Sequence, residues 1–100
     1  MSVTVGVIGL GPMGGNIARN LLKEKFKVVG FDQIREQIIA LEDVGIEIAR
    51  DCTEVAEKVD IIITSLPNMD ALDNAIKGIL RSDKPDQIII ECSTLEVGQK

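Results

Sequence analysis

Six residues near the amino terminus have the spacing of a phosphate-binding loop. They are Gly9-Leu10-Gly11-Pro12-Met13-Gly14, a GxGxxG pattern between a β-branched apolar run and a helical pattern. The first glycine permits a tight turn, the second lets the backbone approach a pyrophosphate, and the third allows close helix–strand packing. Pro12 suits the first turn of a helix, where its missing N–H is not needed. The amides and the dipole of this helix would therefore face a pyrophosphate.

An acidic residue closes the next apolar run. Asp32 lies 18 residues after Gly14, at the carboxyl end of the second predicted strand. A carboxylate there accepts hydrogen bonds from ribose hydroxyls and repels a 2′-phosphate, so NAD is the predicted cofactor. NADP stays possible, because Arg35 is close enough to neutralise an added phosphate. The alternatives are an exposed Arg35 paired with nearby acids, and a glycine turn that binds no ligand.

A parallel sheet is needed to position the loop and the acid. Five apolar runs alternate with four helical patterns, which predicts one dinucleotide-binding domain over residues 1–100. We expect a Rossmann-like, doubly wound α/β sheet with five strands in the order 3-2-1-4-5 and three αβα layers. The predicted strands cover residues 3–8, 27–31, 45–49, 60–64 and 87–91.

The predicted helices follow from apolar spacing and from capping residues. The first starts after Gly11 and ends near Lys25, and the second runs from Ile34 to just before Gly45. For the third, Asp51 and Glu54 form a capping-box-like start. The fourth begins at Asn68 or Asp70, and its predicted apolar face is Met69, Leu72, Ile76 and Ile79.

Two further motifs leave strands at the carboxyl edge of the predicted sheet, where doubly wound folds bind their ligands. Leu66-Pro67 end the fourth strand, and Ser93-Thr94 follow the fifth. The two hydroxyls could hydrogen-bond a nicotinamide or a substrate carboxylate. From the residues alone, a strand terminator is the favoured interpretation of Pro67, and ordinary turn chemistry is the favoured interpretation of the Ser-Thr pair.

Composition excludes several classes of protein. The net charge of -5 comes without a basic patch, which disfavours nucleic-acid binding. Hydrophobic residues make up 45% of the chain and its longest apolar runs are short, so we expect a globular domain without a membrane partner. The chain has no histidine, and Cys52 and Cys92 form no CxxC motif, so no metal site is predicted. Free thiols and the lack of a signal-like start lead us to expect a cytoplasmic protein.

Three motifs together resemble a known family. The runs GVIGLGPMGGNIARNLLKEKFKVVGFD, TSLPN and ECSTLEV are similar to the N-terminal domain of the β-hydroxyacid dehydrogenases. That family includes 3-hydroxyisobutyrate dehydrogenase, tartronate semialdehyde reductase and 6-phosphogluconate dehydrogenase. The resemblance spans essentially the whole chain. Departures at Glu91, Val97 and Asn16-Ile17, where the family often has Asp, Pro and Pro-Met, leave the substrate open.

The resemblance implies an oxidoreductase that transfers a hydride between NAD(P) and a small 3-hydroxy acid. It implies these contacts: the pyrophosphate with Gly9, Leu10, Gly11, Pro12, Met13 and Gly14, the ribose with Asp32, the ribose-nicotinamide portion with Leu66 and Pro67, the nicotinamide end with Thr94, and the substrate near Ser93. The family's catalytic lysine and its helical substrate and dimerisation domain lie beyond residue 100. We therefore assign no catalytic residue, and expect this chain to bind cofactor without turning over substrate.

Two other functions share some of these features. A nonenzymatic NAD-sensing regulatory module would have the glycine loop and the acid without needing Ser93-Thr94. A methyltransferase-like domain that binds S-adenosylmethionine would usually have a different glycine loop and no reason for Pro12-Met13. For the dehydrogenase, we expect a homo-oligomeric parent protein that acts on a small molecule.

Overall fold

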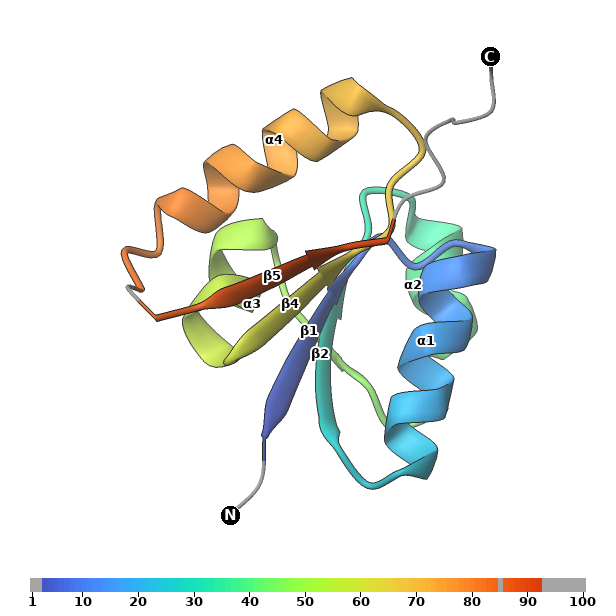
Figure 1. Cartoon of the computed structure of the whole chain (residues 1–100). Helices are drawn as coiled ribbons and strands as arrows, with labels where there is room; N and C mark the ends of the chain where they lie inside the picture. The colour runs from blue at the N-terminus through green and yellow to red at the C-terminus, as the bar shows by residue number, and fades with distance from the viewer. Residues whose placement is uncertain (1–2, 85, 93–100) are drawn as a thin grey trace.

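Strands and helices alternate through the described part of the chain, residues 3–84 and 86–92 of a computed structural model (Figure 1). In chain order the elements are β1 (Thr4–Ile8), α1 (Pro12–Lys23), β2 (Lys27–Phe31), α2 (Arg35–Glu42), β3 (Glu47–Ile48), α3 (Cys52–Lys58), β4 (Ile61–Thr64), α4 (Met69–Leu80) and β5 (Ile88–Glu91). All strand pairs are parallel, in the order β3-β2-β1-β4-β5. The predicted sheet order is thus confirmed. In these ranges, no helix is long and apolar enough to cross a bilayer.

The central strands fill two separate cores, one on each face of the sheet. Val7 and Val28 belong to the core cluster under α1 and α2, whereas their neighbours Ile8 and Val29 belong to the cluster under α3 and α4. Successive side chains of a strand point to opposite faces, so a continuous apolar run serves both. Each fully buried aliphatic side chain contributes roughly 1.5–3 kcal/mol. The glycine loop therefore leaves from one of the most firmly held strands of the fold.

The side chains of the N-cap residues cap α3 and α4 at their amino ends, whereas the N-cap residues of α1 and α2 make no such bond. The Asp51 carboxylate accepts from the amide of Glu54 at 2.8 Å, which confirms the predicted start of α3. Of the two candidates for α4, Asn68 is the cap, since its Oδ1 accepts from the Ala71 amide at 2.8 Å. At α1 the N-cap residue is Gly11, which has no side chain to offer. The amino end of α1 is therefore available to a ligand.

Three details of the predicted elements are wrong. β3 is confined to Glu47–Ile48, because Gly45 has a φ of +99° and belongs to the preceding turn. Ile34 precedes α2 as its N-cap residue and is exposed. Met69 is 64% exposed, so it is not part of the apolar face of α4. The buried residues of that helix are Ala75, Gly78 and Ile79, and Gly78 lies against Cys52 of α3.

Candidate functional site

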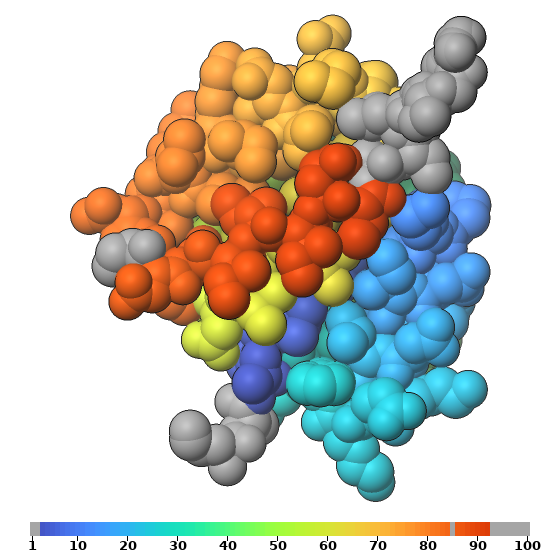
Figure 2. All heavy atoms as spheres, in the orientation of Figure 1, coloured from blue at the N-terminus to red at the C-terminus, as the bar shows by residue number. Residues whose placement is uncertain are grey.

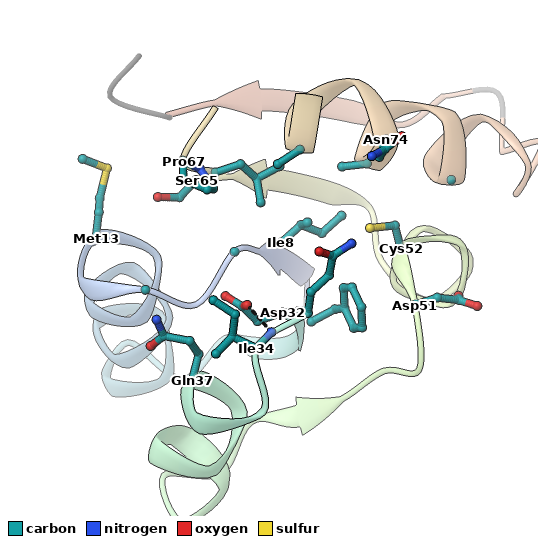
Figure 3. Close-up of a pocket in the computed structure, with 18 of the residues that line it drawn as sticks. Ile8, Met13, Asp32, Ile34, Gln37, Asp51, Cys52, Ser65, Pro67 and Asn74 are labelled. Carbon is teal, nitrogen blue, oxygen red and sulfur yellow. Dashed lines mark hydrogen bonds between the residues drawn. The ribbon is translucent and has the colours of Figure 1, made fainter. Parts of the chain in front are cut away.

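A cleft of about 630 Å³ opens at the carboxyl edge of the sheet (Figure 3). The loop between β1 and α1 borders it on one side, and the loop between β4 and α4 borders it on the other. β1 and β4 are adjacent but not consecutive, so this is the point where the strand order reverses. The predicted site residues that line the cleft are Gly9, Gly11, Pro12, Met13, Asp32, Leu66 and Pro67.

The backbone itself requires the first and third glycines of the loop. Gly9 has a φ of +97°, and a β-carbon there would overlap the carbonyl group of Ser65. A β-carbon on Gly14 would overlap the carbonyl oxygen of Gly9. The turn is closed by the Gly9 amide, which donates to the Phe31 carbonyl at 2.9 Å. These two glycines allow the turn and the helix to approach each other closely, as predicted.

The middle glycine faces open space instead. The heavy atom nearest to a β-carbon on Gly11 would be Nε2 of Gln37, at 3.8 Å. The fold would therefore tolerate a side chain at Gly11. That side chain would, however, collide with a ligand lying in the cleft. Next to Gly11, α1 begins with Pro12 and no side-chain cap, so its dipole and first amides face the cleft. This arrangement fits a diphosphate.

Asp32 holds its carboxylate in the cleft through two backbone amides. Its Oδ2 accepts from the Leu10 amide at 2.6 Å. Its Oδ1 accepts from the Ile34 amide at 2.8 Å, the dashed line in Figure 3. A carboxylate oxygen can accept two hydrogen bonds, so each oxygen retains capacity for a ribose hydroxyl. Arg35 is exposed and does not line the cleft. The charge at the end of β2 is therefore negative, which favours NAD.

Two predicted loop residues shape the cleft without lining it. Leu10 is buried among Val28 and Leu41 in the core under α1 and α2, and its amide is taken by Asp32. Gly14 lies beneath the Gly9 carbonyl. The predicted contacts of Ser93 and Thr94 fall outside the described residues and stay predictions.

The far part of the cleft, between α3 and α4, was missed from the sequence. Cys52 and Asn74 line it, as do Ala75 and Gly78 (Figure 3 labels the first two). Burial, and then the charge of Asp51, raise the pKa of the Cys52 thiol to about 11, so the thiol itself is uncharged at neutral pH. The sequence does carry a signal for this part of the cleft. The small residues at 71, 75 and 78 have a spacing that puts them on one face of a helix.

A parallel sheet with a glycine-rich turn at its reversal point and an acid at the end of β2 defines a dinucleotide-binding domain. Residues 4–100 match the family described as the NAD binding domain of 6-phosphogluconate dehydrogenase. The chain belongs to this family, as the resemblance predicted.

Individual relatives agree with this family assignment. The probable mitochondrial 3-hydroxyisobutyrate dehydrogenase of Dictyostelium discoideum is 36% identical over 98 residues, which cover 95% of this chain and 30% of that protein. The 2-(hydroxymethyl)glutarate dehydrogenase of Eubacterium barkeri is 36% identical over 97 residues, covering 94% and 32%. The solved structure of Mycobacterium tuberculosis 3-hydroxyisobutyrate dehydrogenase with L-serine has a TM-score of 0.88 at 28% identity, covering 94% and 32%.

These relatives are much longer than the chain, which spans about 30% of the first of them. Their names describe dehydrogenases of hydroxy acids. They therefore support the hypothesis of an oxidoreductase over the hypothesis of a regulatory module.

Proposed function

We propose that this chain binds NAD in the cleft and forms the cofactor half of an NAD-dependent 3-hydroxyacid dehydrogenase. The observation that carries the proposal is the pairing of Gly11, open to the cleft beside the uncapped end of α1, with Asp32 beyond it. The first would hold the diphosphate and the second the adenosine ribose. Leu66 and Pro67 would lie along the ribose-nicotinamide portion.

The bound cofactor supplies hydride transfer, and the residues of this chain bind and orient it. Lysine is absent from the described residues that line the cleft. We place the catalytic base outside these 100 residues, in line with the family resemblance. The substrate class is a small 3-hydroxy acid, a description that fits both 3-hydroxyisobutyrate and 2-(hydroxymethyl)glutarate, which are named in the relatives.

Titration calorimetry of the 100-residue chain with NADH and NADPH tests cofactor binding. We expect NADH to bind more tightly than NADPH. Gly11→Leu should weaken NADH binding at least tenfold while the domain stays folded, because the new side chain projects into open cleft. Asn16→Ala, on the exposed surface of α1, is the control and should bind like the wild type. No binding at millimolar NADH, or wild-type affinity in Gly11→Leu, would overturn the proposal.

A separate assay tests the placement of the catalytic base. The chain is mixed with NAD and 3-hydroxyisobutyrate, 2-(hydroxymethyl)glutarate or L-serine, and absorbance at the NADH band is followed. We expect no NADH to form. Turnover by this chain alone would show that the base lies within residues 1–100. The cytoplasmic location remains a prediction, which cell fractionation would check.

A further inference from the structure

Both oxygens of the Asp32 carboxylate are bonded to backbone amides of the chain itself. One bond, from the Leu10 amide at 2.6 Å, crosses 22 residues of sequence and reaches the middle of the glycine loop. The other, from the Ile34 amide at 2.8 Å, fixes the start of α2. The carboxylate therefore holds the loop and the end of β2 together.

The Leu10 amide lies between the end of β1 and the first turn of α1. The preceding amide, that of Gly9, is held by the Phe31 carbonyl at 2.9 Å, and the Leu10 side chain is buried in the core. The next residue, Gly11, has no side chain, and its carbonyl accepts from the Gly15 amide at 2.7 Å in the first turn of α1. Between these two backbone bonds, the bond from the Leu10 amide to Asp32 is the one that ties the loop to a side chain at the end of β2.

We propose that Asp32 is a positioning residue for the pyrophosphate loop in addition to its role as ribose acceptor. The inference rests on the proposed cofactor binding and deepens it, because one carboxylate then couples recognition of the ribose to binding of the diphosphate. Replacing Asp32 to change cofactor preference would also disturb the diphosphate site. Asparagine has one acceptor oxygen in place of two, so it cannot satisfy the amides of both Leu10 and Ile34.

Two ligands separate the roles of Asp32: ADP, and 2′,3′-dideoxy-ADP, which lacks both ribose hydroxyls. Their affinities for the wild-type chain and for Asp32→Asn are measured by calorimetry. If Asp32 only contacted the ribose, Asp32→Asn would leave dideoxy-ADP affinity unchanged, or raise it because a negative charge near the diphosphate is removed. A positioning role predicts the opposite sign, a loss of dideoxy-ADP affinity of about fivefold or more.

Glu36→Gln is the matched control, since it makes the same chemical change at an exposed position of α2 outside the cleft. It should leave the affinity for dideoxy-ADP within about twofold of the wild type. A drop equal to that of Asp32→Asn would overturn the positioning role, because loss of a surface carboxylate would then explain both results.

Amide hydrogen exchange without ligand gives an independent result. In Asp32→Ala, which removes both acceptor oxygens, the Leu10 amide should exchange at least tenfold faster, whereas the Gly9 amide, held by Phe31, should keep its protection. Unchanged Leu10 exchange, or unchanged or tighter dideoxy-ADP binding, would overturn the positioning role and leave cofactor binding standing. Failure of ADP to bind the wild-type chain would instead overturn the proposed function, and the positioning role with it.

Discussion

The carbonyl oxygen of Gly9 occupies the space that a β-carbon on Gly14 would need. Neither group can move by changing a rotamer, because one is backbone and the other is attached directly to it. We therefore expect Gly14→Ala to lower the free energy of unfolding by about 2 kcal/mol or more. Urea denaturation measures the change, with Gly11→Ala as the control. That variant places the same methyl group in open space and should lose about 1 kcal/mol at most. Equal midpoints for Gly14→Ala and the wild type would contradict this packing.

Lys25 occupies a backbone conformation that favours glycine. Its φ is +72°, and it ends α1 in a Schellman motif, in which its amide donates to Leu22 and the Phe26 amide donates to Leu21. The left-handed conformation destabilises a residue with a β-carbon by roughly 1–2 kcal/mol. Lys25→Gly should therefore raise the free energy of unfolding by about 1 kcal/mol. Lys23→Gly, two residues earlier in the last turn of α1, should lower it by about 0.5–1 kcal/mol. If Lys25→Gly were less stable than the wild type, the strain relieved at this φ would be smaller than the entropy that glycine adds to the unfolded chain.

Sequence was sufficient for the sheet and the turn because their signals are local. Apolar runs of strand length, alternating with helical spacing, determine an open parallel sheet once the right-handed crossover rule is applied. Gly9 and Gly14 could be assigned to the turn because the tight turn and close packing there exclude side chains. Asn68 and Asp70 could not be distinguished, because the helix boundary decides which one is the cap.

The features that sequence missed depend on contacts between distant segments. That Asp32 holds the Leu10 amide follows from the path of the loop backbone, which residue types do not encode. The strained conformation of Lys25 has no signal either, since lysine is an ordinary residue near a helix end. The part of the cleft beside Cys52 exists only because α3 and α4 pack together there.

The side chain of Gln87 holds the carboxyl end of α3. Its Nε2 donates to the carbonyls of Ala56 and Val59, at 2.8 and 2.9 Å. Gln87→Met keeps the length of the side chain and removes the donor, so we expect the free energy of unfolding to fall by about 1–2 kcal/mol. Val59 retains a second donor in Lys84 at 2.6 Å, which limits the loss. The control is Asp86→Ala, at the neighbouring exposed position. It should change the free energy of unfolding by less than about 0.5 kcal/mol.

The Cys52 thiol should react slowly at neutral pH. Burial, followed by the charge of Asp51, raises its pKa from 9.0 to about 11, which lowers the thiolate fraction at pH 8 about 100-fold. In a Cys92→Ser background, iodoacetamide should alkylate the folded chain about 100-fold more slowly than the same chain in urea. The folded rate should increase up to about pH 11.

The same shift in the pKa of Cys52 affects stability above pH 9. The folded state holds the thiol proton more tightly than the unfolded state does. The stabilising contribution is therefore fully present below pH 9 and is lost as the pH rises towards 11. Cys52→Ser in the Cys92→Ser background should make the loss of stability over this range smaller. An alkylation profile of the folded chain with its midpoint near 9 would contradict the buried environment of the thiol.

β5 presents an unusually apolar edge to solvent. Ile88, Ile89 and Ile90 are 57%, 40% and 44% exposed, and within the described ranges β5 pairs only with β4 (Figure 2 shows it, in red, across the surface). Three consecutive isoleucines are typical of a strand covered on both faces, whereas open edges usually carry charges or proline. We therefore expect the isolated chain to self-associate through β5 at high concentration.

Ile89→Lys tests this expectation by placing a charge in the middle of the β5 edge. The association constant, measured by sedimentation velocity over a range of concentrations, should fall at least tenfold. Ile39→Lys on α2 removes an isoleucine that is also about half exposed, at 51%, and should leave association unchanged. An equal effect of the two substitutions would mean that added charge alone prevents association. If two chains paired through β5, the lysine of Ile89→Lys would be buried without a charged partner, and association would weaken. Unchanged association in Ile89→Lys would therefore show that the contact lies on another surface.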